Sequence, residues 1–224
     1  IEAAIISHSR IVYKKELVLT PELFDLFILN LYFEDPNGWV GNFADGFRGA
    51  HEKAQRCYSE NQKLTIYFVD NLSATESINL KKQIRSFFTL SNDSCHINDT
   101  HHETMVLAGL ILNPAWDVLD KIKLSAKAST LEQGLKKLIV LGRETGVNPQ
   151  DFCIVGSALW ALTGCRDCAD TDLVLSKHLQ DVPLPDGIGN HASQQAYYPV
   201  SFDEIINDPQ FHFWFLGFKF ARPT

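Results

Sequence analysis

Two short apolar runs flank a Gly-Ser turn and a helical pattern between residues 152 and 175, in the sequence FCIVGSALWALTGCRDCADTDLVL. A short apolar run that ends at a glycine is typical of a strand buried in a sheet, whereas apolar residues at three-to-four spacing indicate a helix. We therefore expect a strand at 152–155, a turn at Gly156-Ser157, a helix at 158–163 and a strand at 171–175. This order requires a fold that combines a sheet with helices.

A similar alternation along the rest of the chain favours an α/β protein, of the α+β kind with a mixed sheet. The triplet Thr20-Pro21-Glu22 is typical of a helix start, and Thr100 with Glu103 forms a capping box before another helix. The expected strands are 3–7, 10–13, 64–69 and 94–97, with an extended aromatic segment at 211–220; the expected helices are 23–31, 44–58, 77–88, 101–112 and 135–146. The polar stretch 125–132 predicts an N-terminal α/β domain at 1–130 and a second domain at 131–224.

The turn and the two aspartates that follow it supply two requirements for the transfer of a phosphate-bearing group, a phosphate cradle and a cation site. Gly156 lets the backbone approach a ligand closely, and Ser157 at the start of a helix can bind phosphate oxygens. Asp170 and Asp172 are two apart, so on one strand they project from the same face and can share Mg²⁺ or Mn²⁺. A serine-capped turn and solvated acids are the simpler account of each feature alone. Together the two features favour a site.

Residues 135–222 resemble the nucleotidyltransferase superfamily, whose hallmark is a strand, Gly-Ser or Gly-Gly, a helix, and then Asp-x-Asp on the next strand. Here twelve residues separate Ser157 from Asp170, and the segment DEIINDPQFHFWFLGFKFARP is similar to polysaccharide-associated members. The resemblance implies a nucleotidyltransferase-like domain that transfers a nucleotidyl or phospho-polyol group, with Mg²⁺ or Mn²⁺, from a nucleotide-activated donor to a hydroxyl of a glycan or polyol in surface polysaccharide biosynthesis. Arg166 either pairs with a neighbouring aspartate or helps to hold a phosphate. Residues 1–130 resemble no named family.

The chain departs from this superfamily in one respect, because active members carry a third carboxylate on a neighbouring strand. Lys219 stands in the aromatic segment that would supply it, and we expect Lys219 to bind a phosphate instead. The third acid is expected from Asp203 or Glu204, or from residues beyond Thr224. The alternative is a non-catalytic module that binds a nucleotide or a glycan on the same fold.

A second polar cluster lies in the N-terminal half and is able to bind a metal, a phosphate or a sugar, although surface histidines at a helix cap are the simpler account. Its members are His96, Asp99, His101 and His102. Cys165 and Cys168 form a C-x-x-C, but without a second pair they predict neither a zinc site nor redox chemistry.

The charge balance argues against nucleic acid as the default partner, because 20 basic and 27 acidic residues give a formal net charge of -7. It makes a third hypothesis, a nucleotidyltransferase that modifies protein or RNA, less attractive for RNA. No run approaches the roughly 18 apolar residues of a membrane span. Five cysteines without framework spacing favour reduced thiols, so we expect a cytoplasmic protein.

Overall fold

The computed structural model describes residues 1–35, 37–59, 63–70, 72–89, 93–98, 100–112, 115–123 and 128–222. The α-helices are α1 (Glu2–Ile6), α2 (Pro21–Tyr32), α3 (Arg48–Cys57), α4 (Ala74–Arg85), α5 (His101–Leu112), α6 (Trp116–Leu119), α7 (Ser129–Thr145), α8 (Ala158–Leu162) and α9 (Phe202–Asn207). The strands are β1 (Ile11–Leu17), β2 (Leu64–Val69), β3 (Phe152–Val155), β4 (Thr171–Leu175), β5 (Ile188–Asn190), β6 (His212–Phe215) and β7 (Phe218–Ala221).

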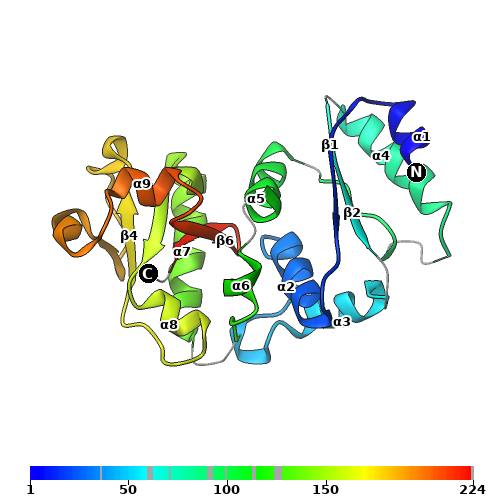
Figure 1. Ribbon diagram of the computed structural model, residues 1–224. Coiled ribbons are helices and arrows are strands. Elements are labelled where there is room, and N and C mark those ends of the chain that lie inside the picture. Colours follow the sequence, from blue (N-terminus) through cyan, green and yellow to red (C-terminus); the bar gives the residue numbers. More distant parts are fainter. Residues whose placement is uncertain are drawn as a thin grey trace.

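These strands form two sheets at opposite ends of the molecule, with α2, α5 and α6 between them (Figure 1). The N-terminal sheet is the antiparallel pair β1-β2, and the C-terminal sheet has five strands in the order β5-β4-β3-β7-β6. Within the larger sheet β3 is antiparallel to β4 and parallel to β7. The expectation of an α/β protein with a mixed sheet is therefore confirmed.

The five-stranded sheet is covered on both faces. On one face Ile154 and its register partner Phe220 belong to the main hydrophobic core, which also contains Leu135 of α7. On the other face Val155 and Val174 pack against α9. Helix α7 approaches β4 so closely that a Cβ at Gly134 would lie 2.1 Å from Thr171 Oγ1, so only glycine fits there.

A tight hairpin joins β6 to β7 and also connects the C-terminal sheet to α2. Leu216 and Gly217 both have positive φ, 50° and 81°, as a two-residue hairpin turn requires. The buried Asn30 side chain of α2 accepts a hydrogen bond of 2.6 Å from the Leu216 backbone N–H and donates one of 2.7 Å to the carbonyl of Leu26. A Cβ on Gly217 would lie 2.6 Å from a Glu34 carboxylate oxygen. The unusual backbone of Leu216 is thus fixed by a buried side chain from the N-terminal half.

The sequence predicted several elements correctly. The strands at 64–69, 152–155 and 171–175 and the helices that begin at Pro21 and His101 are all present. Thr20 caps α2 by accepting from the Leu23 N–H, and helix α7 ends at Gly146 in the left-handed conformation. Two helices begin earlier than expected: α4 at Ala74 and α7 at Ser129.

Other elements were predicted wrongly. Residues 3–7 were expected to be a strand but lie mostly in α1, where Ala4 and Ile5 pack against α4, because a short apolar run does not distinguish a strand from a helix. Residues 94–97 are not a strand, and 211–220 form a hairpin rather than one extended segment. The helix expected at 44–58 is divided into a 3-10 turn (Phe43–Asp45) and α3, because Gly46 and Phe47 are left-handed.

The main core contains residues from both sides of residue 130, such as Phe27 and Phe220, so the division into two domains stays a prediction. Within the part of the chain that the structure describes, none of the helices combines the length and the apolar content needed to cross a membrane.

Candidate functional site

The Gly-Ser turn lies at the carboxyl end of β3, where the chain enters α8. Gly156 is exposed and has a φ of 67°, a conformation that favours glycine. Ser157 occupies the N-cap position of α8 but makes no side-chain capping hydrogen bond, which leaves its hydroxyl available to a ligand. Helix α8 has only five residues, so the turn itself is the main feature of this end.

Asp172 lies beside this turn, in the middle of three adjacent strands. It pairs in register with Val155 of β3 on one side and with Gly189 of β5 on the other. A Cβ on Gly156 would lie 3.1 Å from Asp172 Oδ2, and a Cβ on Gly189 would lie 2.4 Å from Asp172 Oδ1. The carboxylate of Asp172 therefore occupies a space that exists because both of its neighbours are glycines.

Asp170 precedes β4 rather than lying on it, because the strand begins at Thr171. Of the two aspartates, only Asp172 therefore lies on the strand. Asp170 nevertheless acts on Asp172, since burial and the negative charge of Asp170 raise the pKa of Asp172, against the lowering effect of His191. A bound cation would stabilise the ionised form of Asp172 beside this second negative charge.

His191 follows β5 and completes the surroundings of Asp172. Its Nε2 lies 3.1 Å from Asp172 Oδ1, and its Nδ1 lies 2.9 Å from the Tyr198 hydroxyl. A neutral imidazole satisfies both contacts when Nε2–H donates to the carboxylate and Nδ1 accepts from the tyrosine. Burial and the charge of Asp172 raise the pKa of Tyr198, so the phenol stays protonated as a donor.

Neither His191 nor Tyr198 was predicted from the sequence to belong to the site. The short strand Ile188–Asn190 pairs with β4 and so brings His191, the residue that follows it, next to Asp172, but three residues are too few to mark such a strand in the sequence.

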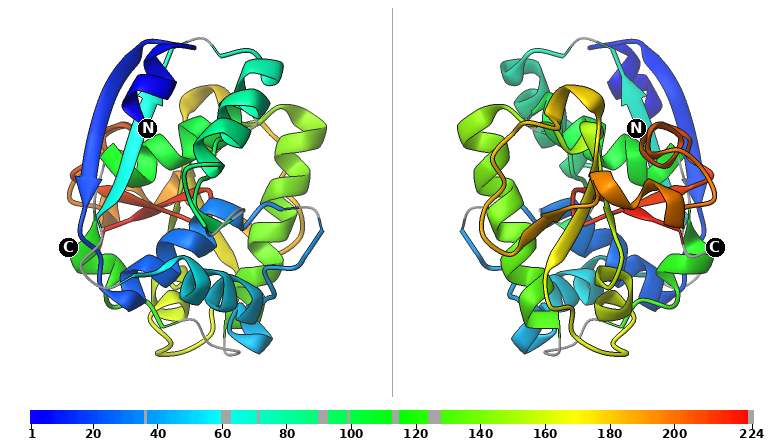
Figure 2. Two further views of the ribbon diagram at one scale, coloured as in Figure 1. Left: turned by 90° about the vertical axis from the view of Figure 1, so that its right-hand side faces the viewer. Right: turned by 90° about the vertical axis from the view of Figure 1, so that its left-hand side faces the viewer.

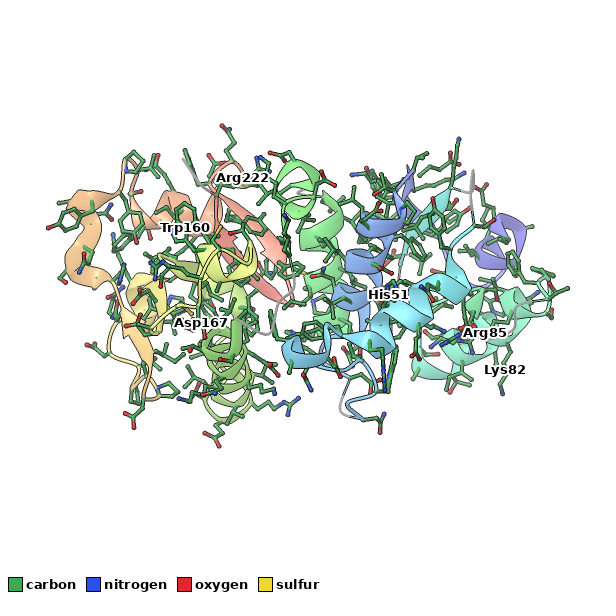
Figure 3. The ribbon with its side chains drawn as sticks, turned by 90° about the horizontal axis from the view of Figure 1, so that it is seen from below. His51, Lys82, Arg85, Trp160, Asp167 and Arg222 are labelled. Atoms are coloured by element: carbon green, nitrogen blue, oxygen red, sulfur yellow. The ribbon has the colours of Figure 1, made fainter. Side chains whose placement is uncertain are left out.

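Arg166 does not pair with the carboxylate of its neighbour Asp167, which instead caps α7. Arg166 is exposed and donates to the Asp167 carbonyl at 3.4 Å. The Asp167 carboxylate accepts from the Thr130 N–H at 3.2 Å and from the hydroxyls of Ser129 and Thr130, so it caps α7, whose first turn it adjoins (Figure 3). Although burial opposes it, this hydrogen bonding lowers the pKa of Asp167. This cap accounts for the early start of α7.

Lys219 does not have the position that the sequence predicted. Its side chain is buried, and its Nζ donates to the carbonyls of Gln150 at 2.6 Å and Ile206 at 2.7 Å. Gln150 precedes β3, whereas the Gly-Ser turn follows it, so the ammonium is bonded at the opposite end of that strand from Asp172. Lys219 is structural here, and burial lowers its pKa.

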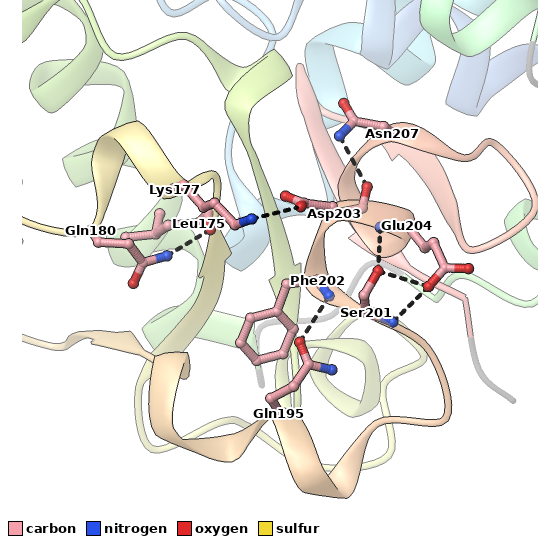
Figure 4. Close-up of polar contacts among 9 residues, drawn as sticks. All are labelled: Leu175, Lys177, Gln180, Gln195, Ser201, Phe202, Asp203, Glu204 and Asn207. Carbon is pink, nitrogen blue, oxygen red and sulfur yellow. Dashed lines mark hydrogen bonds and ion pairs between the residues drawn. The ribbon is translucent and has the colours of Figure 1, made fainter.

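The two acids proposed to replace the missing carboxylate are engaged around α9 (Figure 4). The Glu204 carboxylate accepts from the Ser201 N–H at 2.8 Å and forms a capping box with Ser201. Asp203 lies 3.8 Å from Lys177 Nζ in an exposed ion pair. The capping box holds Glu204 in the local structure of α9, whereas the exposed pair with Lys177 constrains Asp203 little.

The N-terminal histidines do not form one cluster. His96 contacts the Tyr32 hydroxyl at 3.1 Å, His102 lies 3.4 Å from Glu34, and His101 is exposed; Asp99 lies outside the described residues. The Glu103 N–H donates to Thr100 Oγ1 at 3.2 Å, as the capping interpretation predicts. Within the described ranges no group of three or more His, Cys, Asp or Glu side chains is placed to hold a metal ion, and Cys165 and Cys168 are free thiols.

Comparisons with protein-family models, with curated proteins and with solved structures each found no match.

Proposed function

We propose that this protein transfers a nucleotidyl or phospho-polyol group to a hydroxyl acceptor in glycan assembly, with Mg²⁺ or Mn²⁺, on a nucleotidyltransferase-like C-terminal domain. The observation that carries the proposal is the position of Asp172, whose carboxylate lies against Gly156 of the Gly-Ser turn and against Gly189. A phosphate at the turn would therefore be adjacent to a carboxylate that favours a divalent cation.

The residues present suit Mg²⁺. This ion is usually bound in phosphate-transfer sites by one or two carboxylates, together with water and the substrate's own phosphates, rather than by a cage of protein ligands. Asp170 and Asp172 supply that number of carboxylates, and the raised pKa of Asp172 is the electrostatic condition that a cation relieves. When bound, the ion would neutralise charge on the donor phosphate.

His191 is a positioning residue in this proposal. Its Nε2–H holds Asp172 Oδ1, while the Tyr198 hydroxyl fixes the imidazole from the other side. Hydrogen bonds of this kind orient a ligating carboxylate and commonly affect metal affinity 10–100-fold. Ser157 and the backbone of the Gly156 turn would contact phosphate oxygens.

A thermal-unfolding series tests the proposal directly. Mn²⁺ or Mg²⁺ with a nucleoside triphosphate is expected to raise the melting temperature, since a ligand that binds only the folded state stabilises it. Asp170→Asn with Asp172→Asn is expected to abolish the rise, whereas Asp181→Asn, at an exposed position, keeps it. Native protein whose melting temperature does not respond to metal would rule out the proposal.

A non-catalytic binding module on the same fold is the second candidate. The observation in its favour is that Asp203 and Glu204 are engaged around α9 instead of supplying a third acid. A metal-dependent rise in melting temperature without transfer of a radiolabelled donor group to a polyol or glycan would favour this candidate. Transfer of label onto protein or RNA would instead indicate a protein- or RNA-modifying nucleotidyltransferase.

A further inference from the structure

Strand β2 has the composition of an interior strand. Its sequence, LTIYFV, contains no charge and no proline, whereas β1 carries Lys14, Lys15 and Glu16. Charged side chains and prolines protect the edge of a sheet from pairing with another chain, and an uncharged apolar run is typical of a strand with neighbours on both sides. Yet within the described residues β2 pairs with β1 alone.

A cavity of about 960 Å³ runs along β2, and all six residues of the strand line it. One wall comes from α2, including Phe24 and Phe27, and another from α4, including Leu80 and Ile84. Side chains on both faces of β2 take part, so the cavity lies at the edge of the strand rather than over one face. β1 forms the outer side of this pair of strands (Figure 2).

The segment 93–98 lines the cavity as well, and several polar side chains around it have partners within the protein. Lys53 and Asp93 form an ion pair, Arg56 lies 3.3 Å from Asp93, and Tyr32 contacts His96. The charges of Lys53 and Asp93 at the cavity are therefore already paired with each other. What the cavity offers is apolar surface along a strand whose outer backbone groups are not part of a ladder.

We propose that this cavity binds an extended, uncharged and mainly apolar peptide segment, which pairs with β2 as an additional strand. Main-chain hydrogen bonds to an exposed strand supply affinity in this mode of recognition, and pockets for alternate side chains supply specificity. A strand rises about 3.3 Å per residue, so a segment of about six residues matches the length of β2. A second copy's β2 does not suit the space, because it carries its own helices on both faces.

This peptide site lies in the N-terminal half, and its proposed function is separate from the proposed transfer of a phosphate-bearing group. Helices α2 and α4, on the two sides of the cavity, would cover the two faces of the added strand. The side chains on both faces of the added strand would then be buried, so the peptide must be apolar on both faces.

Fluorescence anisotropy with the synthetic peptide KVTIVFVTK, whose uncharged centre VTIVFVT lies between two terminal lysines, tests the proposal on the full chain. The matched control KVTIPFVTK has a proline in the centre, which cannot donate to a ladder. We expect the control to bind at least about tenfold more weakly, a difference of roughly 1.4 kcal/mol. Equal binding of the two peptides, or no binding of the first, would overturn the proposal.

Hydrogen exchange on the native protein locates the peptide without any substitution. The first peptide is expected to slow exchange of β2 amides and to leave β3 and β4 unchanged. Ile66→Lys is expected to weaken binding at least about tenfold, because it places a charge among the apolar side chains of the cavity, whereas Val12→Lys at an exposed position of β1 leaves binding unchanged. A fluorescent fatty acid that binds the cavity while the peptide leaves β2 unprotected would identify a lipid site and overturn the proposal.

Discussion

In the five-stranded sheet the central strand β3 has neighbours on both edges and helices on both faces, whereas in the two-stranded sheet β2 has one neighbour and a cavity along its other edge. All four residues of β3 are buried, and all six of β2 are only half-buried, although both strands are uncharged and apolar. Composition alone therefore does not decide how well a strand is covered. The completed sheet positions Asp172, and the incomplete one provides the candidate docking site.

Matched truncations of one phenylalanine in each sheet should give the largest difference. Phe220→Ala removes a fully buried ring that packs against Phe213 and is expected to lower the free energy of unfolding by about 3–5 kcal/mol. Phe68→Ala removes a half-buried ring of β2 and is expected to cost about 1–2 kcal/mol. Urea unfolding measures both. Equal losses would show that β2 is as well packed as β7.

Asn30 tests whether the two halves unfold together. Asn30→Ala leaves the buried N–H of Leu216 without its acceptor, in a turn where the leucine has positive φ, and is expected to cost about 2 kcal/mol. The exposed Asn37→Ala is the control and should change stability by less than about 0.5 kcal/mol. If the halves are coupled, Asn30→Ala speeds hydrogen exchange in both sheets. Faster exchange confined to β6 and β7 would show that they are not.

The elements that the sequence predicted correctly are those whose signal is local. Thr20 and Pro21 mark the start of α2, and the uncharged apolar runs mark β2 and β3, because capping and burial patterns act within a few residues. The start of α7 was missed because its cap is Asp167, distant in the sequence. Such a contact exists only after the chain has folded.

The candidate site shows the same limit. The sequence placed Gly156 and Asp172 on neighbouring elements, and the structure brings them into contact. It did not reveal His191, because a three-residue strand is too short to give a periodic signal. It misplaced Lys219, because a lysine in an apolar strand was taken to face a ligand, whereas two backbone carbonyls bind it in the interior.

His212 of β6 should make the stability of the five-stranded sheet depend on pH. Burial, helped by the charge of Lys219, lowers the pKa of His212 to about 4, below its ordinary value of 6.5. The unfolded chain therefore binds more protons between these values, and the stabilising contribution of the neutral imidazole, complete above about pH 6.5, is lost as the pH falls toward 4. Between about pH 7.5 and pH 5, we expect the free energy of unfolding of the native protein to fall by about 1–2 kcal/mol more than that of His212→Asn, a range that allows for solvent screening. Urea unfolding of both proteins at a series of pH values measures this. The same fall in unfolding free energy for both proteins would refute the prediction.

The smallest effect is expected from the loss of a helix cap. Two caps with the same geometry, one beside each sheet, allow a comparison. Ser73 caps α4 and Ser201 caps α9, and in both capping boxes the serine N–H donates to a glutamate carboxylate at 2.8 Å. Replacing either serine by alanine should cost about 1 kcal/mol locally. The consequences should differ, because Ile206 of α9 is buried against the five-stranded sheet, whereas α4 packs in a smaller cluster beside the cavity.

We therefore expect Ser201→Ala to lower the protection of β3 and β4 amides together with that of α9, and Ser73→Ala to lower protection in α4, β1 and β2 alone. Native-state hydrogen exchange separates these outcomes, because local openings appear as groups of amides with a common free energy. In the presence of the KVTIVFVTK peptide, the effect of Ser73→Ala on β2 should diminish, since an added strand would give β2 the second neighbour that β3 already has. An unchanged effect in the presence of bound peptide would mean that the peptide does not complete the sheet.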